Sequence, residues 1–438
     1  MEEVLDIIKR DRIKFVNLQF SDMNGKAKSV TIPVSKLSDA LKYGHWFDGS
    51  SIEGFSRISE SDMLLKPDTN TYAVIPWLSE NGGRTARFIC DVYTPEEEPY
   101  ECDPRYILRK ALKEAEELGY VYKTGPELEF FLLKNGDGFK PHDDGNYFDL
   151  VMDMGFDVRR EMMEALTEMG IDIETSHHEV APGQHEITFR YGNALTTADR
   201  VMTLKSTLKA VASKHNLYAT FMPKPIFGVN GSGMHVHQSL FTKEGENAFY
   251  NPSDKYKFSD IAYHFLAGQM KHIKSLAPIL NPLVNSYKRL VPGYEASTYI
   301  CWATINRSAL IRVPKYIKGK EKSIRMEIRC PDPSANPYLA FAVLLKAGLD
   351  GIENKLTPPE PVEENVFHYT DKDLKEKNID TLPHSLYEAL YYMKSSDLMA
   401  TFLGENFLGK YLMAKNEEWD EFRTHVTDWE INKYLNTI

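Results

Sequence analysis

Four segments of this sequence place charged or imidazole side chains at every second position. In GPELEFFLL (125–133), Glu127 and Glu129 alternate with apolar residues, and in SIRMEIRC (323–330), Glu327 lies between two arginines at the same spacing. Successive side chains of a β-strand point to opposite faces, so residues i and i+2 share a face about 6.6 Å apart. These segments therefore predict strands that present a charged face.

The other two segments follow the same rule. In GSGMHVHQSL, His235 and His237 share one face, and in HHEVAPGQHEI a Pro-Gly turn would fold Glu179 back beside Glu186 as a hairpin. A single strand of this kind usually turns its polar face to water. Four strands that carry Glu, His and Arg instead predict a common charged cavity, because a buried charge needs an opposite charge or a metal.

The residues of these strands form an oxygen-rich set of metal ligands. Such a set suits Mg²⁺ or Mn²⁺ better than zinc, which prefers cysteine and histidine. The HExxH pattern of zinc proteases is absent, because His178-Glu179 is followed by Val-Ala-Pro. Two ions need about six protein ligands, and the sequence supplies Glu127, Glu129, Glu179, Glu186, His235 and Glu327.

Arginines are concentrated between positions 289 and 329. Beside a carboxylate metal site, the planar guanidinium group is suited to holding carboxylates and phosphates. Metals on phosphate oxygens, with arginines neutralising the developing charge, are the usual means of phosphoryl transfer. No GxxxxGK[ST] phosphate loop occurs. The arginines are Arg289, Arg307, Arg312, Arg325 and Arg329.

Periodicity and turn residues predict an α+β protein with two domains. The segment TPEEEPYECDP (94–104) breaks all periodicity with three prolines and five acids, so we place the boundary there, between domains 1–100 and 104–438. The first domain is expected to have a helix over 1–12 and strands over 14–20, 27–30, 71–75 and 87–92.

The second domain is expected to begin with a helix that Asp103 caps and Pro104 opens, and that ends at Gly119. Short alternating strands then alternate with helical patterns, which predicts a large domain with a substantial antiparallel sheet. The last seventy residues are also expected to be helical. The helical patterns cover 155–170, 196–215, 257–276 and 335–349.

Composition excludes several classes of protein. The net charge is −11 with no long Lys or Arg run, which disfavours nucleic acid as a partner. Four cysteines form no CxxC pair, which argues against a disulfide scaffold or a zinc ribbon. No apolar run approaches about 18 residues and the first residues are highly charged, so we expect a soluble, cytoplasmic protein with no membrane partner.

Eight motifs in order resemble the class I glutamine synthetase family over essentially the whole chain. They are FDGSSIEGF (47–55), ESDMLLKPD (60–68), GPELEFFL (125–132), HHEVAPGQHEI (177–187), NGSGMHVHQS (230–239), KRLVPGYEA (288–296), NRSALIRVP (306–314) and RMEIRCPDPSANPYLA (325–340).

The resemblance implies an amino-terminal β-grasp domain, a larger catalytic domain with a curved antiparallel sheet and flanking helices, and a homododecamer of two stacked hexameric rings. Each active site would lie between subunits. The implied reaction joins ammonia to the γ-carboxylate of L-glutamate, with ATP first forming a γ-glutamyl phosphate and a water-poor cavity protecting it. Mg²⁺ or Mn²⁺, two or more ions per site, would be the cofactor.

The resemblance also assigns roles by motif position. One ion would lie on Glu129, Glu179 and Glu186, and the other on Glu127, His235 and Glu327. Glutamate would contact Glu129, Asn230, Gly231, His235, Arg289 and Arg329, and the phosphoryl group Arg307 and Arg312. The nucleotide would contact Glu174, Tyr191, His237, Ser239, Lys322 and Arg325. Ammonium would bind near Tyr147, Glu179, Glu295 and the neighbouring subunit's copy of Asp48.

Regulation and rival functions remain open at this point. Phe367 stands where the adenylylated subclass has a tyrosine, with Tyr369 two residues further on, so no adenylylation is expected. The chain is similar to the shorter α form, in which Arg57 would take part in feedback inhibition by glutamine. A regulatory protein partner is compatible with catalysis. The rivals are a ligase that joins glutamate to another amine and a non-catalytic scaffold that reuses the fold.

Overall fold

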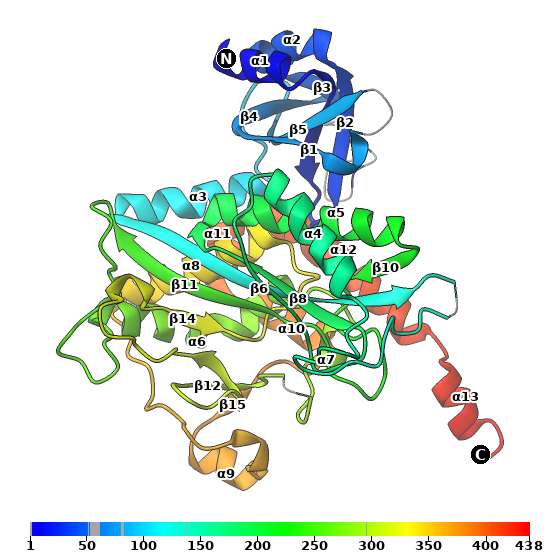
Figure 1. Cartoon of the computed structure of the whole chain (residues 1–438). Coiled ribbons are helices and arrows are strands. Elements are labelled where there is room, and N and C mark those ends of the chain that lie inside the picture. Colours follow the sequence, from blue (N-terminus) through cyan, green and yellow to red (C-terminus); the bar gives the residue numbers. More distant parts are fainter. Residues whose placement is uncertain (1, 51, 53–61, 80–82, 137, 295) are drawn as a thin grey trace.

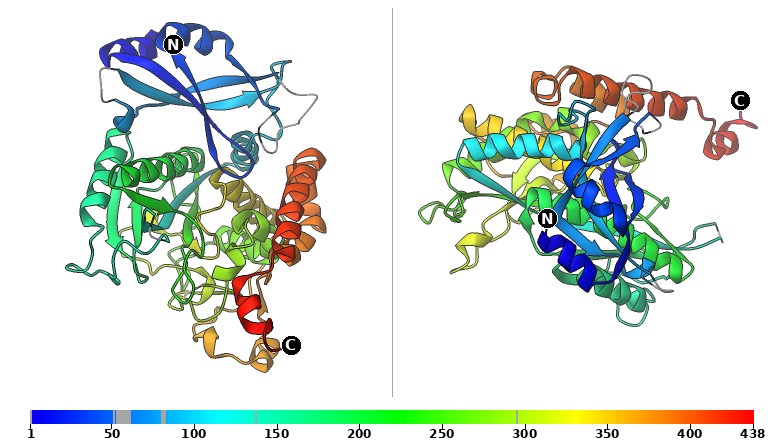
Figure 2. Two further views of the ribbon diagram at one scale, coloured as in Figure 1. Left: turned by 90° about the vertical axis from the view of Figure 1, so that its right-hand side faces the viewer. Right: turned by 90° about the horizontal axis from the view of Figure 1, so that it is seen from above.

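The computed structural model describes residues 2–50, 52, 62–79, 83–136, 138–294 and 296–438. It contains two sheets, one formed by the first hundred residues and the other by the rest of the chain (Figure 1). The smaller part stands on the larger one beside helix α3, and the last helix projects from the body near the carboxyl terminus (Figure 2).

The amino-terminal sheet has the strand order β2-β1-β5-β4-β3. Its central pair, β1 and β5, is parallel, and the other pairs are antiparallel. The expected strand over 71–75 is the end of a longer β4, whose pairing with β5 shifts between Asp68 and Ala73. The elements are α1 (Glu2–Arg10), β1 (Ile13–Ser21), β2 (Ala27–Pro33), α2 (Leu37–Tyr43), β3 (His45–Asp48), β4 (Asp62–Val74) and β5 (Arg84–Tyr93).

Helix α3 (Pro104–Glu117) begins as the capping residues predict. The Asp103 side chain accepts a hydrogen bond from the Arg105 amide, and proline occupies the first turn. Arg105 is buried and lies between three carboxylates: Asp68 and Asp91 of the small sheet and Asp199 of the large domain. This one side chain therefore ties the two parts of the molecule together.

The large sheet follows the path β15-β12-β13-β14-β11-β6-β8-β7, with β9 and β10 also paired to β6. All its pairs are antiparallel except β12 and β13, which are parallel, so the expectation of an antiparallel sheet is correct apart from this pair. The strands are β6 (Tyr120–Lys134), β7 (Ile173–His178), β8 (Gln184–Phe189), β9 (Gly192–Asn193), β10 (Leu217–Thr220), β11 (Met234–Thr242), β12 (Tyr299–Ala303), β13 (Ala309–Arg312), β14 (Met326–Ile328) and β15 (Asp380–Thr381).

Helices pack behind this sheet around α8, a largely apolar helix that contacts α3, α5 and α6. A helix that is buried on nearly all sides needs no polar face, which explains its run of Leu, Ala, Val and Phe. The helices of this part, besides α3, are α4 (Phe156–Glu168), α5 (Ala194–Lys214), α6 (Asp260–Leu280), α7 (Ser286–Arg289), α8 (Pro337–Glu353), α9 (Asp371–Glu376), α10 (Leu386–Lys394), α11 (Asp397–Leu403), α12 (Glu405–Thr424) and α13 (Asp428–Tyr434).

The architecture confirms the predicted α+β fold class, with a small amino-terminal domain and a large sheet-and-helix domain. The domain limits of 1–100 and 104–438 stay a prediction. All four cysteines are buried thiols, and they form no disulfide with one another: Cys90, Cys102, Cys301 and Cys330. Within the part of the chain that the structure describes, no helix has the length and apolar character needed to cross a membrane.

Candidate active site

The strand register brings the predicted carboxylates and histidines together on one face of the large sheet. On the central strand β6, Glu127 lies opposite His235 of β11, and Glu129 lies opposite Glu186 of β8. Directly opposite residues in antiparallel strands have Cβ atoms about 5 Å apart, so each pair is in contact range. Alternation along β6 therefore produces two neighbouring acidic positions.

The same register extends the row on both sides. His237 of β11 lies opposite Glu327 of β14, and Arg312 of β13 lies opposite Glu327 from the other side. At the other end, His177 of β7 lies opposite Glu186. Six adjacent strands thus contribute to one polar face, with Arg312 at one end and His177 at the other.

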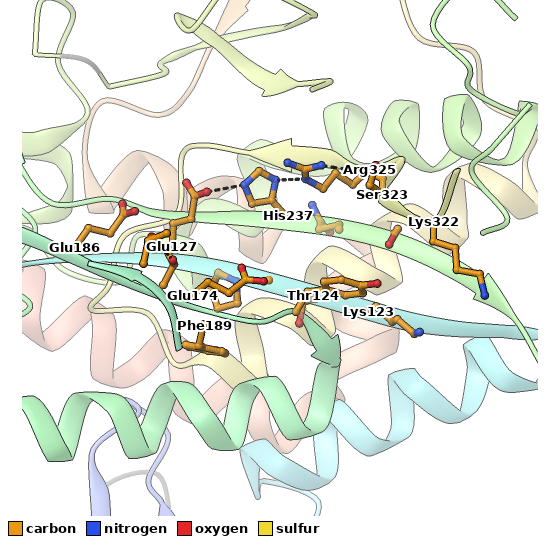
Figure 3. A pocket seen from close by; sticks show the side chains of 17 residues that line it. Lys123, Thr124, Glu127, Glu174, Glu186, Phe189, His237, Lys322, Ser323 and Arg325 are labelled. Carbon is orange, nitrogen blue, oxygen red and sulfur yellow. Dashed lines mark hydrogen bonds and ion pairs between the residues drawn. The ribbon is translucent and has the colours of Figure 1, made fainter. Parts of the chain in front are cut away.

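This face lines a cavity with two compartments. One compartment, of about 370 Å³, contains all six predicted metal ligands together with Tyr147 and arginine side chains. The other, of about 350 Å³, contains all six residues that the resemblance assigns to the nucleotide (Figure 3). Glu127 and Glu186 line both, so they form the shared wall.

Glu327 is the most buried carboxylate of the cavity, with a side chain that is fully shielded from solvent. Arg312 and Arg329 each donate a short hydrogen bond to one of its oxygens. Burial by itself would raise the pKa of Glu327, but Arg329, the two facing histidines and Arg312 lower it to about 2. This carboxylate is therefore ionised throughout the physiological range.

His237 links the shared wall to the nucleotide-side compartment. Its Nδ1 lies 3.1 Å from Nε of Arg325, which can only donate, so Nδ1 accepts and Nε2 carries the proton. That Nε2 donates to Oε1 of Glu127 at 2.8 Å (Figure 3). Although burial opposes it, hydrogen bonding to His235 and His237 lowers the pKa of Glu127.

Two other carboxylates, Glu129 and Glu186, have raised pKa values instead. Burial and the nearby Glu179 raise the pKa of Glu129 to about 8, although Gly233 N and Gln184 Nε2 both donate to Oε2 of Glu129, at 2.9 and 3.0 Å. Burial and surrounding glutamates also raise the pKa of Glu186. A crowd of carboxylates around one space holds protons unless a cation replaces them.

The donor set fits divalent cations. Two groups at the cavity offer ligand atoms within 4.8 Å of one another: Glu127 with His237 and Glu327, and His177 with Glu179 and Glu186. Carboxylates with an occasional imidazole suit a hard ion. These groups differ in part from the predicted sets, because His177 takes the place expected for Glu129 and His237 the place expected for His235.

His235 nevertheless lies near the first group, since its Nδ1 is 3.6 Å from an oxygen of Glu127 and 3.6 Å from one of Glu327. Arg289 is held differently from the other arginines. Its guanidinium donates to the main-chain oxygens of Cys330 at 2.7 Å and Arg329 at 3.2 Å, which fixes its direction. The remaining predicted residues of this compartment are Asn230, Gly231 and Arg307.

Three predicted residues are not placed in the cavity. Asp48 is exposed on β3 of the amino-terminal sheet and does not line either compartment of its own chain. Its side chain accepts from the Ser50 amide at 2.8 Å, as in a capping turn, and hydrogen bonds from the side chain and the amide of Ser50 lower its pKa. Glu295 and Arg57 lie outside the described residues.

Sequence reasoning missed several lining residues. His177 could have been found, because it shares a face with Glu179 by the alternation rule that located the other ligands. Gln184 gave no comparable signal, since its role depends on a hydrogen bond from Nε2 to the carbonyl oxygen of Gly231 at 3.1 Å across the sheet. Tyr294 and Phe189 also line the cavity and carried no pattern of their own.

Comparison with known protein families agrees with this geometry. A model described as the glutamine synthetase catalytic domain matches residues 101–434, and one described as the glutamine synthetase β-grasp domain matches residues 12–95. The chain belongs to the glutamine synthetase family. These matches confirm the family resemblance that the eight motifs indicated.

Relatives named glutamine synthetase match over the full chain. The protein from Clostridium saccharobutylicum is 52% identical, with 99% of this chain and 98% of the relative covered. The protein from Thermotoga maritima is 50% identical, with 99% of each covered. Among solved structures, an ADP complex of a protein called GmaS superposes with a TM-score of 0.91 at 31% identity and full coverage of both chains.

Membership of this family makes the chain a ligase that synthesises glutamine at the expense of ATP. Use of a divalent cation also follows from the family, and the groups of carboxylates and histidines at the cavity fit it.

Proposed function

We propose that this protein joins ammonia to the γ-carboxylate of L-glutamate through a γ-glutamyl phosphate, releasing ADP and phosphate. The observation that carries the proposal is the pair of compartments joined at Glu127 and Glu186. One compartment is rich in arginines and carboxylates. The other is lined by two aromatic rings, Phe189 and Tyr191, and by the cationic side chains of lysines and an arginine. A phosphoryl group can pass between substrates only where two such spaces meet.

Two divalent cations, Mg²⁺ or Mn²⁺, are proposed at the shared wall. One would be held by Glu129, Glu179 and Glu186 and the other by Glu127, His235 and Glu327, with His177 and His237 as neighbouring donors. When bound, the ions would neutralise negative charge on the phosphate oxygens. The pairing of β6 with β8 and β11, and of β11 with β14, sets where the ligands on these strands lie relative to one another.

The glutamate substrate is proposed to bind beside the arginines of the larger compartment. Arg289 and Arg329 suit its carboxylates, because a guanidinium group can pair with a carboxylate through two hydrogen bonds. Asn230 and Gly231 offer polar main-chain and side-chain atoms at the same wall. Arg307 and Arg312 would face the transferred phosphoryl group and stabilise its charge.

The nucleotide is proposed to occupy the second compartment. Lys322 and Arg325 would face its phosphates, and Tyr191 presents an aromatic surface on which a flat base can stack. The other residues proposed to contact the nucleotide are Glu174, His237 and Ser239.

Ammonium is proposed to bind at the Tyr147 side of the larger compartment, next to Glu179, with Glu295 closing the site. Asp48 would reach this place from a second subunit, because in its own chain it lies on the other sheet. A homododecamer of two stacked hexameric rings in the cytoplasm is part of the proposal. Negative-stain electron microscopy of the purified protein tests the assembly.

Regulation is proposed to follow the shorter α form of the family. The Arg57→Ala enzyme should lose inhibition by glutamine and keep its activity, and unchanged inhibition would contradict this role. No adenylylation is expected, because Phe367 stands at the position of the modified tyrosine. An added AMP in intact mass spectra of protein from its native host would contradict that expectation.

The reaction is tested by phosphate release with ATP, Mg²⁺ and glutamate, comparing ammonium with a panel of amines that includes putrescine. Ammonium-dependent turnover with glutamine as product is the expected result. Turnover only with another amine would overturn the ammonium site while leaving the phosphate chemistry. Absence of turnover with every nucleophile, in an assembled oligomer, would favour the non-catalytic scaffold.

A further inference from the structure

Two buried histidines lie behind the hairpin of β7 and β8, on the face that points away from the cavity. His178 and His185 are cross-strand neighbours, and their rings are 4.7 Å apart at 75°. The next pair along the hairpin, His177 and Glu186, points into the cavity, because adjacent residues of a strand face opposite sides. The hairpin therefore carries polar side chains on both of its faces, one toward the cavity and one away from it.

Asp143 holds the first histidine and three main-chain amides. Its Oδ1 lies 2.9 Å from Nε2 of His178 and accepts from the amide of Gly183 at 3.0 Å, in the hairpin turn. Its Oδ2 accepts from the Met154 amide at 3.1 Å. The Gly145 amide donates to Oδ1 at a longer distance of 3.4 Å. One buried carboxylate thus fixes both ends of the loop over 145–154 and the turn of the hairpin.

Arg159 of α4 holds the second histidine. Its Nη1 donates to Nδ1 of His185 at 2.8 Å, and its Nη2 pairs with Asp153, at the end of the same loop, at 2.6 Å. Its Nε donates to Oγ of Ser176 on β7 at 2.8 Å. Because a guanidinium group only donates, the proton of His185 lies on Nε2, which has no partner among the described residues.

Two glycines complete the arrangement. A Cβ atom added to Gly145 would lie 2.6 Å from Nε2 of His178, and one added to Gly155 would lie 2.6 Å from Cε1 of His185. Neither glycine has a positive φ, so the requirement is for space against the rings. The main chain at both ends of the loop therefore packs closely against the two histidine rings.

The loop carries Tyr147 into the cavity. Its ring meets the ring of His177 at 89° with centroids 5.6 Å apart, and it lines the same compartment as Glu179. The Phe148 amide also donates to the main-chain oxygen of His178 at 3.2 Å. The place of Tyr147 relative to the hairpin is thus set by contacts made behind the sheet.

A metal site does not explain this cluster. Asp143, His178 and His185 do offer ligand atoms within 4.8 Å of one another. However, the Arg159 guanidinium lies against one of these atoms and would repel a cation. In addition, both ring nitrogens of His178 face acceptor oxygens, one of Asp143 and one of the Glu179 main chain, so they donate hydrogen bonds and offer a metal no lone pair.

We propose that Asp143, His178 and Arg159 are positioning residues, which fix Tyr147 against Glu179 and Glu186 by clamping the loop 145–154 to the back of the β7–β8 hairpin. The effect on ammonium rests on the proposed function, because it assumes that ammonium binds beside Tyr147. A displaced loop would weaken binding of ammonium while leaving the nucleotide compartment, on the other side of the shared wall, intact.

The test uses the full-length oligomer and two variants that act on the same contact. Asp143→Asn weakens the acceptor for His178, and Gly145→Ala pushes on the ring without removing any hydrogen-bonding group. Each should raise KM for ammonium by about tenfold or more and change KM for ATP by less than about twofold. The matched control is His272→Gln, which breaks a histidine–aspartate pair of 2.7 Å between α6 and α8.

Hydrogen exchange gives a second result that does not depend on activity. Exchange at the amides of Gly183 and Met154 should be faster in Asp143→Asn, with exchange in α8 unchanged. Equal rises of KM for both substrates, or unchanged KM for ammonium with unchanged exchange, would overturn the proposal. If the wild type shows no ammonium-dependent turnover, the proposed function fails, and the exchange result alone decides whether the clamp exists.

Discussion

Glu327 shows how far a single residue of the cavity depends on its neighbours. It is fully shielded, and its charge is balanced by Arg312 of β13, by two histidines of β11 and by Arg329, which directly follows its own strand. Glu327→Gln removes the charge and leaves Arg312 and Arg329 facing a neutral group. We expect kcat/KM to fall by about 100-fold or more and the affinity for Mg²⁺ to fall as well. Steady-state kinetics and a Mg²⁺ titration measure both effects.

The control for this variant is Glu353→Gln, at the exposed end of α8. Its kinetics should match those of the wild type. A Glu327→Gln enzyme with normal kinetics would show that this carboxylate does not take part in the reaction.

The raised pKa of Glu129 predicts that metal binding releases protons. Below about pH 8 the metal-free carboxyl of Glu129 is protonated, because burial and Glu179 raise its pKa. A cation must displace that proton, so the apparent affinity for Mg²⁺ should increase as the pH rises toward about 8 and then level off. Calorimetry in buffers with different heats of ionisation counts the protons released.

The matched variant is Glu129→Gln, which should release about one proton fewer per bound ion. Binding of Mg²⁺ that is equally tight between about pH 6.5 and 8.5, without proton release, would contradict the assignment of this raised pKa to the metal site.

At the scale of elements, the β1–β2 turn is fitted to the start of α8. Gly25 has φ +76°, and a Cβ added there would lie 2.9 Å from the Cα of Asn336. Gly25→Ala should lower the free energy of unfolding by about 1–3 kcal/mol, because it combines backbone strain with a clash against main chain. Chemical denaturation measures this difference.

Gly245→Ala separates the two contributions. Gly245 has φ +86° but nothing within 4 Å of the added Cβ, so it should show the strain without the clash. Equal losses of stability in the two variants would show that the contact with Asn336 costs nothing.

Elements also show what the sequence could predict. Alternation located Glu127, Glu129 and Glu327 because each lies on a strand whose two faces meet different surroundings, and the period of two follows from strand geometry. It could not locate Tyr147, which lies on an irregular loop with no period. Nor could it predict that β12 and β13 are parallel, because that pairing depends on how the connecting chain crosses the sheet.

At the scale of the whole molecule, Arg105 joins the amino-terminal sheet to helix α5 of the large domain. It is 2% exposed and contacts Asp68, Asp91 and Asp199. Arg105→Met leaves these carboxylates without their shared partner, so we expect a loss of about 3–5 kcal/mol in the free energy of unfolding. Denaturant unfolding, followed separately by fluorescence and circular dichroism, measures it.

The control is Arg190→Met, which removes an exposed pair with Asp172 and should cost about 0–1 kcal/mol. Equal losses in the two variants would contradict the view that Arg105 holds the two parts together.

Asp48 differs from the other predicted site residues, because its surroundings in the chain show no catalytic contact among the described residues. Its segment reads as a capping turn, and the structure has that turn, with the side chain exposed on the small sheet. Only the family resemblance suggests a role for it, because the role proposed for it lies in another subunit and leaves no signal in its own surroundings. The carboxylates of the large sheet were predictable because their partners lie in the same chain.

The wall shared by Glu127 and Glu186 has a consequence for inhibitor design. With the nucleotide and glutamate bound as proposed, a compound that joins an adenosine fragment to an amino-acid fragment through a short phosphorus-containing tether would occupy both compartments at once. Once one fragment is bound, the other is held at a high effective concentration, so the joined compound can bind far more tightly than either fragment. Its selectivity over ordinary ATP-binding proteins would come from the second fragment, which would contact the carboxylates and arginines of the other compartment.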